Sequence, residues 1–281
     1  MEILKSIQEV KQYVQKIKKE GNTVGLVPTM GYFHEGHLEL MRRARAKGHQ
    51  VLVTLFVNPA QFGPNEDFDT YPRDFERDFK LAREVGVSAI FVPAMEEIYP
   101  EGYNTYVKVE GMSEVMCGYY RPNFFRGVAT VVLKLFNITT PDEAFFGQKD
   151  GQQAIIVKKM VKDLNLDIPI EVVPTVREED GLAMSSRNVY LNPKERQAAS
   201  IINKSLKLIE EMVHKGERNA GRLIEAFKNN INTEPLAQLQ YVEIRYTSNL
   251  QPVEELNDEA MMATAVIIGS ARLIDNIVLK I

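Results

Sequence analysis

The 281-residue chain has no tryptophan and a single cysteine, Cys117. One cysteine excludes an internal disulfide and is typical of proteins in a reducing compartment. A cysteine in this situation is more often a small buried side chain than a reactive thiol. No apolar run is long enough to span a membrane, and the segment 1–21 interleaves charges with apolar residues, unlike a signal peptide. We therefore expect a cytoplasmic protein with no membrane segment.

An excess of basic charge is also missing, because 34 lysines and arginines face 38 acidic residues, for a formal net charge of −4. This balance argues against a nucleic acid partner. No GxGxxG motif follows an apolar run, so a dinucleotide fingerprint is absent. His49 and His214 lie in stretches without metal-ligand spacing, so no metal site held by protein side chains is expected. What the sequence does contain is a regular alternation of short apolar runs and amphipathic segments.

Up to about residue 175, this alternation indicates parallel strands separated by helices. The apolar runs are nearly continuous, as in strands that are covered on both faces. The order predicts an α/β fold with a doubly wound, mostly parallel, Rossmann-like sheet in a domain of residues 1–175. A surface helix is also expected within 1–21, where apolar residues from Leu4 to Ile17 recur at helical spacing. The expected strands are Thr23–Pro28, Gln50–Val57, Ala89–Val92, Glu143–Phe146 and Ile170–Val173, and the expected helices are Leu38–Lys47, Arg73–Val85, Gly127–Ile138 and Gln152–Leu164.

From residue 176 to residue 281 the pattern is that of a smaller α+β domain. Asn192 and Pro193 suit an N-cap and a first helical position, and Gly216 follows the expected end of that helix near His214. In doubly wound sheets, ligands bind beyond the carboxyl ends of the strands. We expect the smaller domain to cover a nucleotide there. Its other expected elements are a helix at Ala220–Ile231 and strands at Gln240–Arg245, Ala260–Ile268 and Ile277–Ile281.

The most informative segment is VGLVPTMGYFHEGHLEL, in which an apolar run ends and a glycine-containing turn leads into a helix. His34 and His37 stand three residues apart at the start of that helix. Unpaired N–H groups and the positive end of the helix dipole attract anions there, and Gly31 and Gly36 let a ligand approach the backbone closely. A P-loop is excluded, because His37 and Leu38 stand where it needs Lys and Ser or Thr. We interpret the segment as a phosphate-binding turn.

Two later segments also suit a nucleotide. The segment 184–187, which reads MSSR, offers two hydroxyls and a fixed guanidinium fork to phosphate oxygens. Lys149 follows an apolar strand in FFGQKDGQQ, where it can meet a phosphate as a compact charge. Asp150 can orient that lysine or contact the nucleotide, and Gln153 can face the same cleft.

Two further segments suit a small acid. Asn58 and Gln61, in NPAQF, supply neutral amides that recognise hydroxyls and carboxylates without adding charge. Arg121 and Arg126 precede the expected helix at 127–138, and either guanidinium can neutralise an anion. The residues alone therefore indicate a protein that activates a small carboxylate with ATP.

Paired with the histidine turn, MSSR resembles the HxGH and KMSKS-type motifs of the nucleotidyl-transfer superfamily that includes class I aminoacyl-tRNA synthetases. Over nearly its whole length the chain resembles the pantoate–β-alanine ligase family. This resemblance is specific, because it rests on several segments spread along the chain and not on one motif. The segments that carry it are PTMGYFHEGHLEL, FVNPAQF, YPRDFERD, RGVATVV, FFGQKDGQQ, VPTVREEDGLAMSSRN and GSARLIDNI.

The resemblance implies an ATP-dependent, AMP-forming ligase that joins pantoate to β-alanine through pantoyl adenylate and releases pyrophosphate. ATP is then a substrate, and Mg²⁺ is expected to be held mainly by ATP oxygens and not by protein side chains. The implied partners are these small molecules, and the implied assembly is a homodimer.

The resemblance also implies roles for particular residues. His37 is the implied proton donor, and His34, Lys149 and Arg187 are the other implied catalytic residues. Asn58, Gln61 and Gln153 are the implied pantoate contacts, and Gln61 also lies where β-alanine is contacted. The implied ATP-binding residues are Met30, Gly31, Tyr32, Phe33, His34, Glu35, Gly36, His37, Gly147, Gln148, Lys149, Asp150, Val176, Met184, Ser185, Ser186 and Arg187.

Two positions depart from the pattern of that family. Gln148 stands where the family often has Glu, and this should matter little because the lysine and aspartate that follow are kept. Asn123 and Phe124 stand where the family often has Gly-His, so a histidine is missing from a loop near the expected site. Any function of that loop then depends on Arg121 and Arg126.

The residues by themselves leave other functions open. A nucleotidyltransferase that attaches AMP or CMP to a phosphorylated acceptor would need further cations where Asn58 and Gln61 supply amides. A tRNA ligase is disfavoured by the acidic balance and by the lack of a basic appended domain. A nucleotide-binding module without catalysis would seldom need as many charge-stabilising side chains as His34, His37, Lys149 and Arg187.

Overall fold

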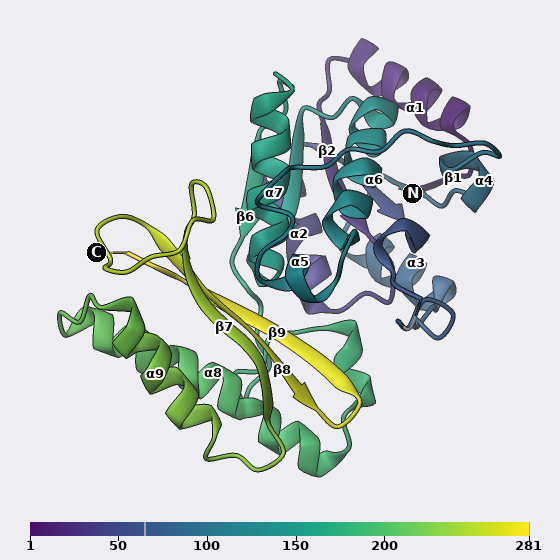
Figure 1. Ribbon diagram of the computed structural model, residues 1–281. Helices are drawn as coiled ribbons and strands as arrows, with labels where there is room; N and C mark the ends of the chain where they lie inside the picture. The colour runs from purple at the N-terminus through teal and green to yellow at the C-terminus, as the bar shows by residue number, and fades with distance from the viewer. Residues whose placement is uncertain (65, 281) are drawn as a thin grey trace. The chain divides into compact units, whose positions relative to one another are not determined.

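The computed structural model describes residues 1–64 and 66–280, and the chain forms two compact units. Figure 1 shows the elements of both, coloured along the chain. Unit 1 comprises Met1–Ser113, Arg121–Gly147 and Ile156–Pro174. Unit 2 comprises Glu114–Tyr120, Gln148–Ile155 and the chain from Thr175 onward. The expected domains 1–175 and 176–281 stay a prediction, and the two compact units cross that division at 114–120 and 148–155.

Unit 1 contains a six-stranded parallel sheet within the described residues, in the order β1-β4-β3-β2-β5-β6. Four successive residues of β3, 51–54, are buried, so both faces of that strand are covered, as the continuous apolar runs predict. The predicted doubly wound α/β fold is confirmed. The strands are β1 (Glu2–Leu4), β2 (Val24–Thr29), β3 (Gln50–Leu55), β4 (Ala89–Phe91), β5 (Glu143–Gly147) and β6 (Ile170–Val173).

The helices of unit 1 follow the βαβ order of the chain. They are α1 (Ile7–Lys19), α2 (Glu35–Ala46), α3 (Phe75–Glu84), α4 (Met95–Ile98) and α6 (Phe124–Thr139), with a 3-10 turn η1 (Pro59–Gln61). The helix α7 (Gly151–Asp163) begins in unit 2, and its residues from Ile156 belong to unit 1. The core of the sheet packs apolar side chains of β2, α2 and β3 together, among them Val27, Met41 and Val53.

The prediction of a helix that includes Leu4 is wrong at its start. Residues Glu2–Leu4 form β1 and pair with β4, while α1 begins only at Ile7. The reason is a capping box: the Glu9 N–H donates to Ser6 Oγ at 3.2 Å, and the Ser6 N–H donates to the Glu9 carboxylate at 3.0 Å. The cap fixes the first turn and leaves the preceding apolar residues to the sheet.

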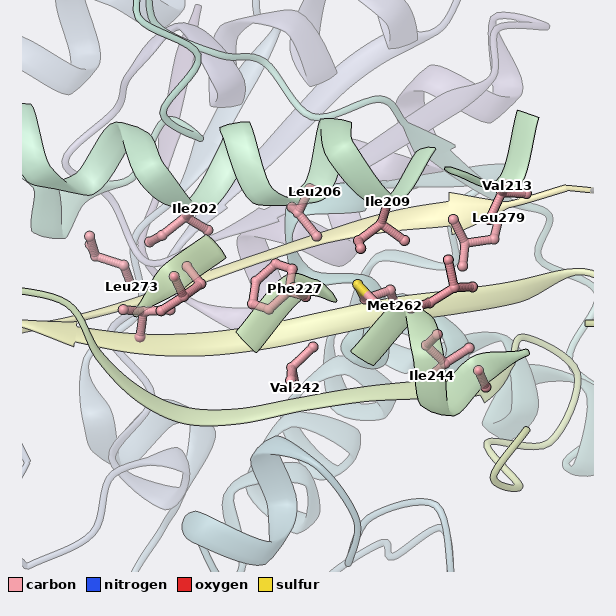
Figure 2. Packing of buried hydrophobic residues seen from close by; sticks show 14 of the residues in the cluster. Ile202, Leu206, Ile209, Val213, Phe227, Val242, Ile244, Met262, Leu273 and Leu279 are labelled. Atoms are coloured by element: carbon pink, nitrogen blue, oxygen red, sulfur yellow. The ribbon is translucent and has the colours of Figure 1, made fainter. Parts of the chain in front are cut away.

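Unit 2 contains an antiparallel three-stranded sheet in the order β7-β8-β9, within the described residues. Figure 2 shows side chains of its core, including Leu206, Phe227 and Met262, packed between the helices and the sheet. The predicted α+β class of this region is confirmed. Its larger elements are α8 (Pro193–His214), α9 (Ala220–Ile231), β7 (Gln238–Tyr246), β8 (Ala260–Ile268) and β9 (Ala271–Leu279), and its short ones are α5 (Cys117–Tyr120), η2 (Gln148–Asp150) and η3 (Ser186–Tyr190).

The start predicted for the last strand is wrong, because β9 begins at Ala271 and not at Ile277; the predicted end, Ile281, lies outside the described residues. Gly269, at φ +57°, allows a tight turn after β8. The strand then includes Asp275 and Asn276, two buried polar residues that interrupt the apolar pattern. In contrast, Asn192 caps α8 as predicted, with its side chain accepting N–H bonds from the first turn. Among the described residues, no helix combines the length and the apolarity that a membrane crossing requires.

Candidate functional site

The histidine turn of unit 1 connects β2 to α2 through two successive left-handed residues. Gly31 has φ +88° and Tyr32 has φ +53°. A side chain in this conformation costs roughly 1–2 kcal/mol, so Tyr32 needs compensation from its surroundings. A Cβ on Gly31 would lie 3.1 Å from Asp78 Oδ2, which favours glycine there for space as well as for φ.

Asp78, on α3, supplies that compensation. Its Oδ2 accepts the Tyr32 N–H and its Oδ1 accepts the Phe33 N–H, each at 2.6 Å, and the residue is 1% exposed. Burial raises the pKa of Asp78, although both N–H groups and the nearby Arg77 act in the opposite direction. The carboxylate therefore braces the backbone that leads into His34.

Asp78 is not among the residues predicted from the sequence, although a signal for it exists. Phe75, Asp78 and Ala82 follow one another at intervals of three and four, so they share one face of α3. Asp78 and Ala82 are both buried, and an acidic residue on the buried face of an amphipathic helix must have a partner. The identity of that partner, a turn 45 residues earlier in the chain, is not encoded locally.

His34 and His37 lie together at the first turn of α2. His34 is the N-cap, and its Nδ1 accepts the Gly36 N–H at 3.2 Å. The His34 N–H donates to His37 Nδ1 at 3.3 Å, and the two ring centroids are 4.0 Å apart. Because each Nδ1 accepts a main-chain hydrogen, a neutral ring carries its proton on Nε2. This arrangement makes each Nε2 a donor at the positive end of a helix, which is suited to an anion.

The second group of unit 1 is the turn η1, where Asn58 holds Gln61. Asn58 is 1% exposed, and its Nδ2 donates to Gln61 Oε1 at 3.0 Å and to the Gly127 carbonyl at 3.2 Å. Its Oδ1 accepts from the Ala60 N–H and from the Tyr99 hydroxyl, so the amide is fully occupied within the protein. Gln61 Nε2 lies 3.0 Å from Met30 Sδ, which joins this turn to the histidine turn.

The loop that departs from the family pattern also acts on η1. Arg121 donates from Nε to Glu66 at 2.6 Å and from Nη2 to the Gln61 carbonyl at 3.1 Å. Its guanidinium carbon lies 3.8 Å from the ring centroid of Phe124, so Phe124 stacks on that arginine. Arg126 lies 4.5 Å from the ring centroid of Tyr106. In this chain the loop is therefore held by an ion pair, by a hydrogen bond to η1 and by cation–π contacts.

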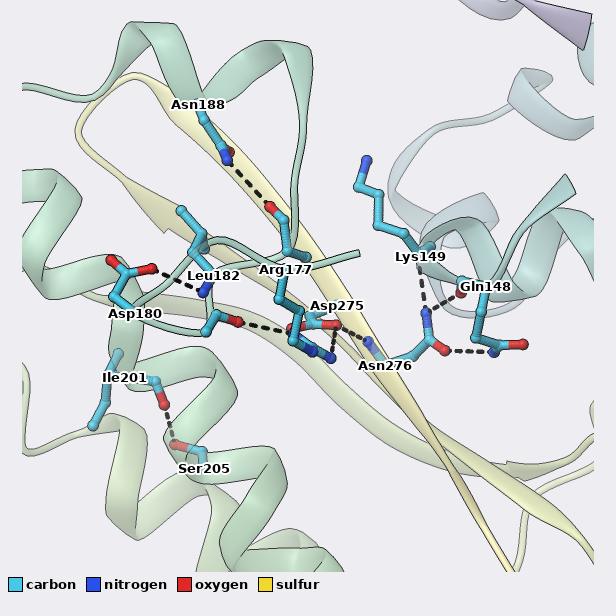
Figure 3. Close-up of polar contacts among 12 residues, drawn as sticks. Gln148, Lys149, Arg177, Asp180, Leu182, Asn188, Ile201, Ser205, Asp275 and Asn276 are labelled. Carbon is cyan, nitrogen blue, oxygen red and sulfur yellow. Dashed lines mark hydrogen bonds and ion pairs between the residues drawn. The ribbon is translucent and has the colours of Figure 1, made fainter. Parts of the chain in front are cut away.

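In unit 2, Lys149 lies in the short turn η2 between β5 and α7. Its Nζ is 3.6 Å from Asp150 Oδ1. Figure 3 shows the amide of Asn276, on β9, against this turn: Nδ2 donates to the carbonyls of Gln148 and Lys149, at 2.8 and 3.0 Å. Gln148 Nε2 donates back to Asn276 Oδ1 at 2.7 Å. The departure at Gln148 thus forms a reciprocal amide pair.

The MSSR segment follows a hairpin that is held on the same strand. The Met184 N–H donates to the Val176 carbonyl at 3.0 Å, which closes the hairpin. Ser185 then caps η3, with its hydroxyl 3.3 Å from the Arg187 N–H. At the base, Arg177 forms a two-bond ion pair with Asp275, at 2.6 and 3.0 Å. Asp275 and Asn276 are not among the residues predicted from the sequence, although they lie in the GSARLIDNI segment.

Each unit therefore assembles part of the predicted site. In unit 1 the structure brings Met30 and Gln61 together, and His34 and His37 together. In unit 2 it places Lys149 and the base of the MSSR hairpin on neighbouring residues of β9. Convergence of the histidines with Lys149 and Arg187 on one triphosphate stays a prediction. Within the part of the chain that is described, no group of three or more His, Cys, Asp or Glu side chains is arranged to hold a metal ion.

The sequence was compared with known proteins. The family model described as pantoate-beta-alanine ligase matches residues 2–278. A pantothenate synthetase from Carboxydothermus hydrogenoformans is 55% identical over 282 residues, which cover 100% of both chains. One from Pelotomaculum thermopropionicum is 54% identical over 279 residues, which cover 99% of both chains.

Solved structures give the same result for the fold. A crystal structure of pantothenate synthetase from Thermus thermophilus has a TM-score of 0.93 and 42% identity, and 99% of each chain is covered. A pantoate-beta-alanine ligase from Francisella tularensis, complexed with beta-gamma ATP and beta-alanine, has a TM-score of 0.82 and 33% identity. That comparison covers 99% of this chain and 97% of the other.

Proposed function

The chain belongs to the pantoate-beta-alanine ligase family, and on that premise we propose that it makes pantothenate from pantoate and β-alanine at the expense of ATP. In the first step, a pantoate carboxylate oxygen attacks the α-phosphorus of ATP. The bond to the β-phosphate oxygen breaks, so pyrophosphate leaves and pantoyl adenylate forms. In the second step, the amine of β-alanine attacks the activated carbonyl, and AMP leaves as the amide forms.

The histidine turn carries this proposal. Two Nε2 donors at a helix N-terminus can hold phosphate oxygens and stabilise the charge that develops as pyrophosphate leaves. The turn contains no serine or cysteine, and the proposed reaction needs no enzyme nucleophile, because one substrate attacks another. The Francisella tularensis relative, complexed with beta-gamma ATP and beta-alanine, supports the same two substrates here.

The turn η1 is the proposed acceptor site. Gln61 is the proposed contact for pantoate and for β-alanine, with Gln153 as a further pantoate contact. The bonds of Asn58 favour a role in holding Gln61 over direct contact with pantoate, because its amide is occupied within the protein. Neutral amides suit a hydroxy acid that must keep a nucleophilic carboxylate.

Unit 2 supplies the remaining proposed ATP contacts. Lys149 and Arg187 are the proposed cations for the phosphate oxygens, with hydroxyl donors beside them at Ser185 and Ser186. Mg²⁺ enters bound to the oxygens of ATP, as part of the substrate. Positioning of the two reactants and stabilisation of charge then account for catalysis, and no covalent enzyme intermediate is needed. The further proposed ATP contacts of unit 2 are Gln148, Asp150, Val176 and Met184, and those of unit 1 are Met30, Gly31, Tyr32, Phe33, Glu35, Gly36 and Gly147.

The alternative is a nucleotidyltransferase of the same superfamily that acts on a phosphorylated acceptor. Such an acceptor needs cations, whereas η1 presents the amide of Gln61, and the nearby Arg121 is paired with Glu66. This contrast favours a carboxylic acid acceptor. We also propose a homodimer, which sedimentation equilibrium would test.

ATP–pyrophosphate exchange with a panel of small hydroxy acids tests the function. Exchange that requires pantoate, followed by pantothenate formation on addition of β-alanine, is the expected result. Other hydroxy acids of similar size serve as controls for acceptor specificity. Exchange without any carboxylic acid, or only with a phosphorylated acceptor, would overturn the proposal in favour of the nucleotidyltransferase.

A further inference from the structure

Asp275 and Asn276 are adjacent polar residues in the middle of β9. They are only 3% and 4% exposed, in a strand whose other buried residues are apolar. Successive side chains of a strand point to opposite faces of the sheet, so the two residues reach different segments of unit 2. Figure 3 shows this arrangement, with Arg177 contacting one residue and the Gln148–Lys149 turn contacting the other. Buried polar groups persist in such a strand only where they are well paired.

Asn276 clamps the turn that carries Lys149. Both hydrogens of its amide are used on consecutive carbonyls, those of Gln148 and Lys149. Its oxygen accepts the Gln148 amide, so the orientation of the Asn276 side chain is fixed as well. The contacts act on the main chain and leave the Lys149 side chain to reach a ligand. A Cβ on Gly151 would lie 3.0 Å from Asn276 Oδ1, so the backbone of the turn approaches this amide closely.

Asp275 anchors the hairpin that leads into MSSR. Its carboxylate accepts two bonds from Arg177, whose Nη1 also donates to the Gly181 carbonyl at 3.1 Å. Arg177 thereby ties both arms of the hairpin to the strand. The Asn276 N–H donates to Asp275 Oδ1 at 2.8 Å, which connects the two anchors.

We propose that Asp275 and Asn276 are positioning residues that set the spacing between Lys149 and the Met184–Arg187 segment. This inference rests on the proposed function, in which both segments bind the phosphates of ATP. The Gln148–Lys149 turn and the base of the hairpin are held by neighbouring residues of one strand, so the spacing between them depends on that strand. Neither Asp275 nor Asn276 needs to touch the nucleotide.

A double-mutant cycle between Asn276→Ala and Lys149→Ala tests the inference. We expect Asn276→Ala to raise the Kd for ATP, measured by calorimetry, by about tenfold, because the carbonyls of Gln148 and Lys149 lose the amide that holds the turn in place. In the Lys149→Ala background the same change should alter the Kd less than about twofold, since the side chain that the turn positions is gone. Equal losses in both backgrounds would show a general structural effect and overturn the inference, as would an unchanged Kd in the single variant.

Asn230→Ala is the matched control. The Asn230 amide also donates within unit 2, to Ser205 Oγ at 2.9 Å, but it joins α9 to α8. We expect this variant to lower the melting temperature while leaving the Kd for ATP unchanged. If Asn276→Ala does not fold, Asn276→Ser retains a hydroxyl donor and enters the same cycle.

Hydrogen exchange separates failure of this inference from failure of the proposed function. Asn276→Ala should speed amide exchange within 148–152, and Asn230→Ala should not. If the unaltered protein shows no pantoate-dependent ATP–pyrophosphate exchange, the proposed function fails, whatever the rates of amide hydrogen exchange in the variants. If it is active and residues 148–152 exchange no faster in Asn276→Ala, the positioning role alone is overturned.

Discussion

Two turns carry proposed catalytic side chains: the histidine turn of unit 1, residues 30–37, and the lysine turn of unit 2, residues 148–150. The side chain that holds the first accepts main-chain hydrogen bonds, and the side chain that holds the second donates them. The carboxylate of Asp78 accepts two main-chain N–H groups, whereas the amide of Asn276 donates to two main-chain carbonyls. In each case a buried side chain from a distant element holds the backbone of the turn, and in the histidine turn the rings of His34 and His37 also accept main-chain N–H groups. The difference is that the carboxylate of Asp78 titrates, whereas the amide of Asn276 does not; we call these two residues the holders of their turns. Stability of the two turns should therefore respond differently to pH.

The largest effect is expected from the side chains that the two turns present. His37→Ala and Lys149→Ala should each lower pantoate-dependent pyrophosphate exchange about a hundredfold, the loss typical for one well-placed donor, or about 3 kcal/mol. Melting temperatures near that of the unaltered protein would confirm that both variants are folded. Near-normal exchange in either variant would remove that turn from the catalytic side of the comparison.

Loss of the titrating holder comes next. Asp78→Ala leaves the buried N–H of Phe33 and the partly buried N–H of Tyr32 without an acceptor, and should lower the free energy of unfolding by about 2–3 kcal/mol, read from urea denaturation. The rate of ATP–pyrophosphate exchange should also fall, because the backbone that carries His34 is no longer held by Asp78. Asp78→Asn retains one acceptor oxygen and should lie between the two. A fully stable Asp78→Ala would mean that the turn needs no brace.

Gly127→Ala tests a third way of holding backbone, by close packing. An added Cβ would lie 2.1 Å from the Ala60 carbonyl oxygen and 2.7 Å from the Gln61 nitrogen, so η1 must move. Overpacking of this kind costs about 1–3 kcal/mol, and the displaced Gln61 should raise the KM for pantoate more than the KM for ATP. Gly102→Ala is the control, with no heavy atom within 4 Å of the added carbon, although its φ of +77° adds some strain. Equal shifts in both KM values would exclude a local effect on η1.

The pH response separates the two holders directly. Because burial raises the pKa of Asp78, the native state keeps that proton to higher pH than the unfolded chain does. Stability from this group is therefore greatest below its ordinary value of 3.8 and falls as the pH rises through the raised pKa. The stability difference between the unaltered protein and Asp78→Asn should decline over that window, while the difference for Asn276→Ala stays flat. An Asp78 difference that grows with pH would have the wrong sign.

The smallest effect is expected where neither holder is involved. Lys215 and Glu211 form an ion pair at the C-terminal end of α8 at 3.7 Å, with side chains 79% and 66% exposed. Lys215→Ala should change the free energy of unfolding by less than about 0.5 kcal/mol and leave exchange untouched. A larger change would show that surface charge contributes to the differences above.

Local signals in the sequence predict most of the elements. The apolar runs predict β2 to β6 because buried parallel strands need no alternation, and Asn192–Pro193 predicts the start of α8 because capping is local. The prediction is wrong at β1, where a capping box at Ser6 cuts the expected helix short. It is also wrong at the start of β9, where Asp275 and Asn276 break the apolar pattern.

The residues of the proposed site also divide into those that local motifs predict and those that only the fold reveals. The residues that would meet a ligand, such as His37 and Lys149, stand in compact motifs and were predicted. The residues that hold those motifs, Asp78 and Asn276, were not, because a hydrogen bond to main-chain atoms demands no particular residue type at the other end. Only the fold reveals which backbone each of them meets.

The separation of each holder from its turn has a consequence during synthesis. Asp78 follows Phe33 by 45 residues, whereas Asn276 follows Lys149 by 127 residues. At the usual rate of translation, Asn276 is synthesised roughly 6 to 25 seconds after the lysine turn that it holds. Asp78 follows the histidine turn after about a third of that time, so the nascent chain contains the carboxylate that holds the histidine turn well before it contains the amide that holds the lysine turn.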